Sequence, residues 1–467
     1  MAGIVCLLVI VSWGVMLSGN LSGRGASDDL LFHWPAIEQF ADELPNPDLS
    51  DYPSATTPGY HLLLAPLVKM GIGHTGIQLI ASVWTLGLFA LLGWVIAARF
   101  GKGAIILMLP MLASMYVLYP GIWLLPDNAG WLGVLAILLL ALQPNPTWKT
   151  WALSGLILFG LVWIRQVHIW IAGVIWLGAW LGSSDQTPAP ARLFSAIFER
   201  TGRTFIALAC TIPAFTALVW FMLMWGGLVP PTFHENHQGP NPATPGFILT
   251  QLAILSVFFA PMLWPMLKEA WKHQWAWIIF AAIVGAALGI IPESSYSYDA
   301  GRYSGWWNLI DKFPIIANRS PIIMLGSIAG SIALVVWITL TNRRDGWIWI
   351  GTLIAFTLAQ SANHANWQRY HEPMLLMMIV LILARSSAIG QYTRRVLFGS
   401  VLLALMLGAL TVSSMWSAKP VKAPAEQSGG FSMPSDSAKR MTPSRALAYK
   451  GSDSIAIPGQ SGRFVRR

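Results

Sequence analysis

Residues 75–98 read TGIQLIASVWTLGLFALLGWVIAA, a run without one charged side chain. A helix of about 20 mainly apolar residues is long enough to cross the hydrocarbon core of a bilayer. This stretch therefore predicts a membrane-spanning helix. Apolar stretches of the same kind lie on both sides of it along the chain, so the fold is decided by how many there are and what separates them.

Such stretches recur from residue 3 to residue 414. Lipid leaves backbone N–H and C=O groups without water partners, so spanning segments are helices or strands of closed barrels. None of the stretches alternates as a barrel strand does, and the sequence predicts an all-α, polytopic membrane helix bundle. We predict about 13 transmembrane helices, at 3–19, 75–98, 104–118, 129–142, 151–164, 167–182, 204–224, 246–266, 275–291, 321–340, 346–360, 373–385 and 395–414.

The composition supports a membrane protein and excludes two other classes. Of the 467 residues 55% are apolar and only 10% are charged, whereas soluble domains carry about a quarter charged residues. The net charge of +9 does not indicate nucleic acid, because the basic residues lie in short loops and in the C-terminal tail. Cys6 and Cys210 both lie in apolar runs, which excludes a disulfide framework.

The first apolar run has no Lys or Arg before Arg24, so we interpret it as a retained helix and not a signal peptide. With the N-terminus in the cytoplasm, 13 basic residues fall in inner loops and 7 in outer loops, as the positive-inside rule expects. We predict a multi-pass protein of the inner (cell) membrane whose long polar loops face outward. Residues 1–414 form the catalytic domain with a first outer loop at 20–74, and 415–467 form a basic, disordered tail.

The first outer loop is the most acidic part of this face. It begins ASDDLLFHWP at Ala26. A carboxylate directly after a helix can act as a general base or bind a cation, so Asp28 and Asp29 are candidates. The simpler interpretation is a pair of solvated loop acids. The other acids of the loop are expected on a solvated helix and turn, and the Thr57-Pro58-Gly59 stretch predicts a sharp turn back to the membrane.

Two further polar groups lie between apolar runs. Asp127 and Asn128 precede the run at 129–142, where an Asp is usually a helix cap. Arg165, Gln166 and His168 occupy a short turn, and charged groups at membrane depth mark functional sites. The planar guanidinium of Arg165 suits an anionic headgroup such as phosphate. A snorkelling arginine is the alternative.

Two histidine-containing loops complete the candidates. His234-Glu235-Asn236-His237 lacks the His-Glu-x-x-His spacing of zinc proteases, and contact with phosphate or sugar is preferred over a metal. Residues 363–371 read NHANWQRYH, the densest polar and aromatic group in the chain. It can bind a sugar and a phosphate through aromatic faces, amides and a guanidinium. An interfacial aromatic belt is the alternative.

These residues, in this order, resemble the GT-C class of membrane glycosyltransferases. The chain is most similar to the family that adds the terminal α-1,2-linked glucose to dolichol-linked oligosaccharide from dolichyl-phosphate glucose. The family's Asp-Glu-x-Phe-His-x-Pro motif matches Asp29 to Pro35, with Leu30 in place of Glu. Its Thr-Thr-x-Pro-Gly-like segment matches Thr56 to Gly59. Its Arg-Gln-x-Asn-Ile-x-Trp segment matches Arg165 to Trp170, with His168 in place of Asn, and its His…Arg-Tyr stretch resembles His364 to His371.

The resemblance implies transfer of a monosaccharide from a polyprenyl-phosphate donor to an acceptor hydroxyl on a glycan, lipid or protein, beside membrane lipids and without nucleic acid. Asp29 is then the general base and Asp28 assists it. The other candidates would bind substrate: His33, Thr57, Arg165, Gln166, His234, His237, His364, Trp367, Arg369, Tyr370 and His371. No cofactor is predicted, no metal ligand is assigned, and a divalent metal stays open.

Two other functions compete with this one. A transporter or flippase for a lipid-linked or anionic substrate places ionisable residues inside helices near the midplane. A polymerase or ligase of surface polysaccharide presents a large basic outer loop. The predicted helices carry almost no charge, and the first loop is acidic, so the sequence favours the glycosyltransferase.

Overall fold

The structure is a computed structural model. It describes residues 2–19, 22–183, 193–236, 239–294, 305–310, 312–386, 390, 392–419 and 421. These residues are helical and contain no β-strand, which confirms the all-α prediction for them. Five helices in this part of the chain are long and apolar enough to cross a membrane, judged by length and composition. The total of about 13 stays a prediction, and most of the predicted tail lies outside the described residues.

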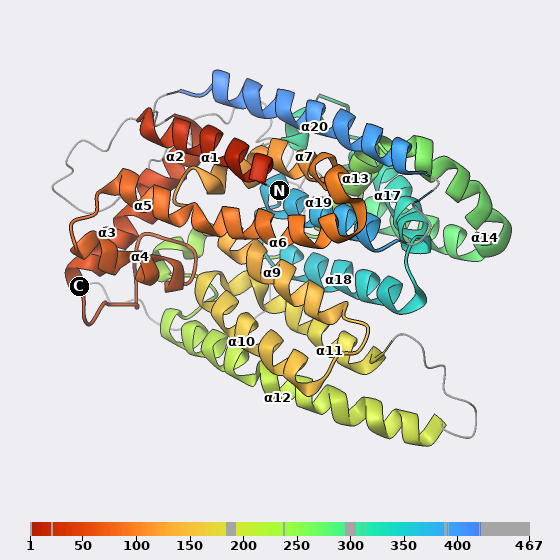
Figure 1. Cartoon of the computed structure of the whole chain (residues 1–467), viewed down its shortest axis with the longest axis horizontal. Coiled ribbons are helices and arrows are strands. Elements are labelled where there is room, and N and C mark those ends of the chain that lie inside the picture. The colour runs from red at the N-terminus through yellow and green to blue at the C-terminus, as the bar shows by residue number, and fades with distance from the viewer. Residues whose placement is uncertain are drawn as a thin grey trace, which may run out of the picture. The chain divides into compact units, whose positions relative to one another are not determined.

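The first half of the chain forms helices joined by short turns (Figure 1). In chain order they are α1 (Ala2–Leu17), α2 (Gly23–Asp28), the π-helix η1 (Asp29–His33), α3 (Trp34–Glu43), α4 (Gly59–Lys69), α5 (His74–Ala81), α6 (Val83–Phe100), η2 (Gly101–Gly103), α7 (Ala104–Ala113), α8 (Met115–Leu118), η3 (Tyr119–Gly121), α9 (Asp127–Ala141), α10 (Trp148–Ile164), η4 (Gln166–Ile171) and α11 (Ala172–Leu181).

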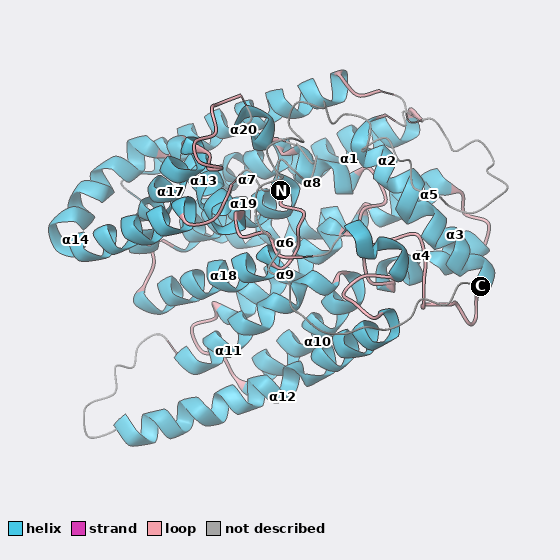
Figure 2. Ribbon diagram, turned by 180° about the vertical axis from the view of Figure 1, so that it is seen from behind, coloured by secondary structure: helices cyan, strands magenta, loops and turns pink. Residues whose placement is uncertain are grey.

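The second half contains the longest helices (Figure 2). They are α12 (Leu193–Trp225), η6 (Pro231–Asn236), α13 (Thr244–Val257), α14 (Ala260–Ile290), the short α16 (Trp306–Ile310), α17 (Pro321–Thr339), α18 (Arg343–Ser361), α19 (Gln368–Arg385) and α20 (Thr393–Trp416).

One pair of predicted spans is wrong. The sequence predicts helices at 246–266 and 275–291, but α13 ends at Val257 and α14 runs from Ala260 to Ile290 with a kink at Gln274. Prolines in the first turn and at position 265 fit a helix start better than a helix middle. The polar residues taken for a loop stay helical because Glu269 pairs with Lys272 and His273 one turn away.

The predicted first outer loop folds into helices. The buried faces of α3 and α4 pack together through Ile37, Phe40 and Leu64. The solvated positions predicted for its other acids are confirmed for four of them, since Glu38, Asp42, Asp48 and Asp51 are exposed. The loop is thus a small helical layer with its own core, and it can hold Asp28 and Asp29 in fixed positions.

Helix α19 lies in the middle of the bundle. Every residue from His371 to Ala384 is buried, and α19 contacts α6, α7, α8, α9, α13 and α17. A helix that is apolar on all sides belongs in an interior of this kind. Its first turn therefore projects the 363–371 group out of the core at one end of the bundle.

Close helix packing builds the wall formed by α13, α14 and α17. At Gly330 of α17 an added Cβ would lie 1.9 Å from the carbonyl oxygen of Leu249, and at Gly289 of α14 it would lie 2.2 Å from Ser327 Oγ. Glycine lets backbones approach in this way, as is common between membrane helices.

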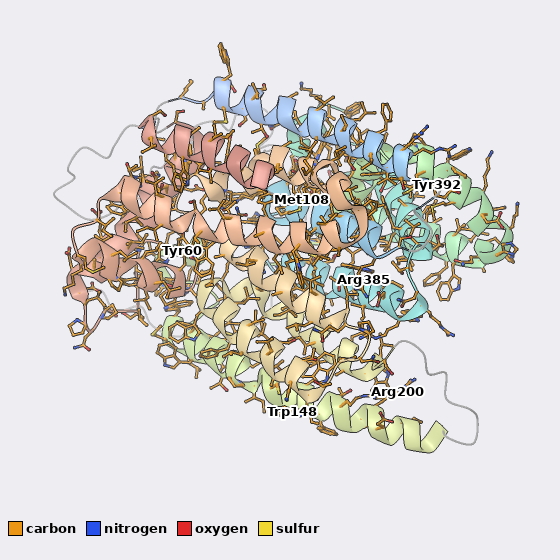
Figure 3. The ribbon with its side chains drawn as sticks, in the orientation of Figure 1. Tyr60, Met108, Trp148, Arg200, Arg385 and Tyr392 are labelled. Atoms are coloured by element: carbon orange, nitrogen blue, oxygen red, sulfur yellow. The ribbon has the colours of Figure 1, made fainter. Side chains whose placement is uncertain are left out.

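The end of α20 returns to the first loop. Lys419 O accepts a hydrogen bond of 3.0 Å from Gly23 N, and Tyr119 Oη donates to Ser414 Oγ at 2.9 Å. Tyr392 marks the opposite end of α20 in Figure 3, and Tyr60 of the first loop lies far from it. The C-terminal end of α20 and the first loop therefore lie at the same end of the bundle.

Candidate active site

The two neighbouring acids of the first loop face different partners. Asp28 ends α2, and Asp29 begins η1, a five-residue π-helix. A π-turn changes the direction of successive side chains and often occurs at functional sites. Asp28 forms an ion pair with Arg369, and its side chain keeps 14% of its area exposed. The structure thus brings residues 341 positions apart into contact.

Asp29 is sealed inside the protein. Its side chain has no exposed area, and both carboxylate oxygens are occupied. His74 Nε2 lies 3.0 Å from Oδ1, Gln78 Nε2 donates to Oδ2 at 2.9 Å, and the backbone N–H of Leu124 donates to Oδ2 at 3.2 Å. Asp29 therefore joins η1, α5 and the segment before α9. No free oxygen of Asp29 faces a substrate among these contacts.

A second ion pair lies beside the first. Arg165 pairs with Asp127, which is nine-tenths buried. Helix α9 starts at Asp127, but no side-chain capping hydrogen bond is present at its start, so the interpretation of Asp127 as a cap is wrong. The carboxylate goes to Arg165 because the extended backbone at Arg165 ends α10 and directs its side chain toward α9. Asn128 instead ties α9 to α6 and to the end of α8, through Thr85 Oγ1 and Val117 O.

Two aromatic rings connect the arginines. The Arg165 and Arg369 guanidinium carbons each lie 5.1 Å from the centroid of Tyr370. Trp367 stacks on Tyr370 at 5.4 Å, with Arg369 at 4.7 Å and Arg24 at 4.5 Å from the Trp367 ring. Each contact is a cation–π geometry. We call Arg24, Asp28, Asp127, Arg165, Trp367, Arg369 and Tyr370 the arginine–aromatic cluster.

A neutral histidine pair lies below Asp28 in the first loop. His33 Nδ1 and His61 Nε2 are 3.0 Å apart, and the rings are stacked. Burial lowers the pKa of His33 to about 4, although Asp28, Asp29 and Asp127 act in the opposite direction. Burial, and then His33, also holds the pKa of His61 well below its ordinary value. These rings carry no charge at neutral pH, so they shape the site without adding to its cations.

Thr57 and Gln166 hold the loop onto the bundle. Thr57 Oγ1 donates to Val162 O at 2.7 Å, and its N–H donates to Gln166 Oε1 at 3.1 Å. The Gln166 amide nitrogen donates to Ala55 O at 2.9 Å and to Leu228 O at 2.8 Å. Both side chains are engaged with protein, so they position the loop beside the cluster. His168 is buried against Gly130 in the same region.

The remaining histidines lie elsewhere in the structure. His371 is fully buried and bonds Gln251 at 3.0 Å, because successive residues of a helix point in different directions and Arg369 takes the outward one. His234 contacts Val229 O at 3.0 Å, and the backbone oxygen of His364 accepts from Asn241 at 2.9 Å. His237 lies outside the described residues. These three described histidines make none of the contacts found in the cluster.

Sequence reasoning missed four kinds of contact. Arg24 was counted only for topology, and His74 and Gln78 were not considered as partners of Asp29. Glu372 is buried and accepts from Ser114 Oγ at 2.5 Å and from the Gln368 amide. Glu372 follows NHANWQRYH directly and is an acid inside an apolar run, which is the signal that could have found it.

The site contains no metal-binding group within the described residues. No set of three or more His, Cys, Asp or Glu side chains there is arranged to hold an ion. The arrangement instead offers two carboxylates, three guanidiniums and two aromatic rings. Such a set can bind an anion and accept a proton beside it.

The comparisons with known proteins give no family. No family model matches the chain, and no curated protein matches it. Among solved structures, the chain is similar to the crystal structure of ArnT from Cupriavidus metallidurans bound to undecaprenyl phosphate. The identity is 15% and the TM-score is 0.41, with 89% of this chain and 77% of that chain covered. A likeness of this degree carries no argument, and the function is inferred from the site itself.

Proposed function

We propose that the chain is a glycosyltransferase that moves a monosaccharide from a polyprenyl-phosphate donor to an acceptor hydroxyl at the outer face of a membrane. The observation that carries this proposal is the arginine–aromatic cluster, in which two carboxylates, three guanidiniums and two rings meet at one end of an apolar bundle. The cations suit a lipid phosphate, the carboxylates suit a hydroxyl proton, and the bundle suits a polyprenyl chain.

In this proposal Asp28 is the general base. A base must come within hydrogen-bond reach of the proton that it accepts. Asp28 keeps an exposed fraction beside the cluster, whereas Asp29 is sealed with both oxygens bonded. We therefore assign proton transfer to Asp28 and give Asp29 the task of fixing η1. This assignment reverses the roles expected from the sequence resemblance.

The proposed donor phosphate binds Arg369 and Arg165. Each guanidinium makes only one carboxylate contact, so each has further N–H groups for phosphate oxygens. When phosphate engages Arg369, the carboxylate of Asp28 loses part of its partner and gains basicity. The acceptor oxygen then attacks the anomeric carbon with inversion, its proton passes to Asp28, and the carbon–oxygen bond to phosphate breaks.

The alternative, a transporter or flippase, has one observation in its favour. Ionisable side chains are buried inside α18 and α19, at Arg344, Asp345 and Glu372. Buried charges in membrane helices are often part of a transport path. All three have hydrogen-bond partners within the described residues, which fits a structural role. The two functions make different predictions in one experiment.

The test uses purified full-length protein with radiolabelled polyprenyl-phosphate hexoses and candidate acceptors. We expect Asp28→Asn to lower kcat by about 10²–10⁴-fold while the thermal stability stays near that of the wild type. Asp29→Asn should instead lower stability, because a sealed carboxylate with three donors is lost. Unchanged transfer by Asp28→Asn would refute the base.

Two other outcomes test the function and the orientation. An absence of transfer from every polyprenyl donor, together with substrate uptake into proteoliposomes, would establish the transporter instead. A single cysteine at the exposed Glu38 should react with a membrane-impermeant reagent added outside intact cells. Labelling only after the membrane is opened would place the first loop on the inner face.

A further inference from the structure

The charges of the arginine–aromatic cluster do not cancel. It contains Arg24, Arg165 and Arg369 and only two carboxylates, Asp28 and Asp127. Each carboxylate is paired with a different arginine, Asp28 with Arg369 and Asp127 with Arg165. Arg24 is left with a ring contact, and among the described residues no carboxylate forms an ion pair with it. The excess positive charge of the cluster therefore resides on Arg24.

The position of Arg24 is set by the protein. It lies in the first turn of α2, next to Gly23, whose N–H is bonded to Lys419 O and whose φ of +84° suits glycine. The side chain is exposed, while the Trp367 ring under it is 7% exposed. An exposed guanidinium on a buried ring is oriented and still reachable from outside.

Arg24 and Arg369 can reach one phosphate together. Their guanidinium carbons lie 4.5 and 4.7 Å from the centroid of the same ring, so they are no farther apart than these two distances added. A phosphate group that accepts one hydrogen bond on each side spans such a gap. Arg369 brings Asp28 with it, whereas Arg24 brings no negative charge.

Sugar transfer changes the charge on this phosphate. The donor is a phosphodiester with one negative charge. As the acceptor oxygen bonds to the anomeric carbon, the electron pair of the broken bond stays on the phosphate oxygen. The product is a phosphomonoester that carries about −1.5 to −2 at pH 7, since its second pKa is about 6. Charge that appears during the reaction is stabilised best by a cation that is not already neutralised.

We propose that Arg24 takes up the charge that develops on the leaving phosphate, and that it therefore distinguishes a polyprenyl phosphomonoester from its phosphodiester. This inference rests on the proposed function. It assigns a catalytic role to a residue outside every motif of the sequence, and it predicts that Arg24 acts on kcat more than on the KM for the donor.

The experiment measures binding of two lipids to full-length protein in lipid nanodiscs. One is a polyprenyl phosphate and the other is its methyl phosphodiester. For Arg24→Gln we expect affinity for the monoester to fall about tenfold or more, and affinity for the diester to fall by less than about threefold. Arg24→Lys should restore most of the monoester affinity, because the charge is kept.

Arg200→Gln is the matched control. Arg200 lies on α12, away from Tyr60 and the first loop in Figure 3, and its replacement should change neither affinity. The preference lost in Arg24→Gln should also shrink in wild-type protein below about pH 5, where the monoester carries a single charge.

The outcomes separate the two proposals. Equal losses for both lipids, or none, would overturn the role of Arg24 and leave the proposed function intact. Failure of the wild type to bind either lipid would overturn both.

Discussion

The two ends of α19 each carry an arginine, and they are bonded in opposite ways. With 18 residues the helix is about 27 Å long, so its ends lie near the two faces of a bilayer core. At the Arg385 end, Arg385 and Arg344 share the carboxylate of Asp345. Their other N–H groups donate to backbone carbonyls of Ala141, Leu142 and Gly182.

Those carbonyls belong to the ends of α9 and α11. The last carbonyls of a helix have no partner within the helix, and buried ones need a donor. Arg344 and Arg385 supply it, so their hydrogen-bonding capacity is used by the protein. Figure 3 shows Arg385 on the side of the bundle away from Tyr60 of the first loop.

At the other end, Arg369 holds one carboxylate oxygen and two ring faces. Its Nε has no hydrogen-bond partner among the described residues although it is buried, and its Nη2 makes a 3.3 Å contact with Tyr370 Oη. Unused donors in a buried guanidinium are costly unless a ligand completes them. The same residue type thus serves as a structural bond at one end and as a binding group at the other.

The largest effect expected from breaking this contrast comes from Asp345→Ala. It leaves Arg344 and Arg385 without their buried counter-charge, and breaking such a pair costs about 3–5 kcal/mol. Thermal or denaturant unfolding in detergent should show this loss. Asp42→Ala, on the exposed face of α3, is the control and should leave stability unchanged. A fully stable Asp345→Ala protein would show that this end is not a structural bond.

The next effect comes from exchanging the two arginines in turn. Arg369→Gln removes charge-assisted hydrogen bonds to phosphate worth about 1.5–3 kcal/mol, so binding of the polyprenyl phosphate donor should weaken by about 10–150-fold. Arg385→Gln should instead lower the unfolding temperature and leave donor affinity in the surviving folded protein near that of the wild type. Equal loss of donor affinity in both variants would remove the distinction between the ends.

The smallest effect concerns pH and only the Arg369 end. Burial lowers the pKa of His33 from 6.5 to about 4. Below pH 6.5 the unfolded chain binds a proton at this ring that the folded chain does not, so stability falls with pH until about pH 4. At pH 5 this amounts to about 2 kcal/mol.

His33→Gln should therefore flatten the fall in unfolding temperature between pH 6.5 and 4.5, even if its stability at pH 7.5 is lower. His273→Gln, an exposed histidine on α14, is the control. Parallel curves for His33→Gln and the wild type would mean that the His33–His61 pair does not stay neutral on folding.

Much of this fold can be predicted from hydropathy. The apolar run at 75–98 contains no charge, and it appears as α5 and α6 with a break only at Ser82. Such runs show where helices form because every apolar side chain adds to the same preference. Boundaries are harder, as α14 shows, since local Glu–Lys pairs and prolines decide whether two apolar runs are one helix.

The site was predicted in part. Asp28, Arg165, Arg369, Trp367 and Tyr370 were all candidates, because charge at the end of an apolar run is rare and visible. The division of labour between Asp28 and Asp29 was not predictable, since it depends on a π-turn that no pattern marks. Arg24 was missed because its meaning comes from a ring more than 300 positions away in the chain.

The hydrogen bond between Asp28 and Arg369 joins residues 341 positions apart, and this separation has a consequence for biosynthesis. At about 5–20 residues per second a ribosome needs roughly 17–70 s to proceed from one partner to the other. For that time the first loop is already synthesised while its counter-charge does not yet exist. We expect Asp28 to stay exposed to water, and the loop to stay a target for chaperones and proteases, until the last third of the polypeptide has entered the membrane.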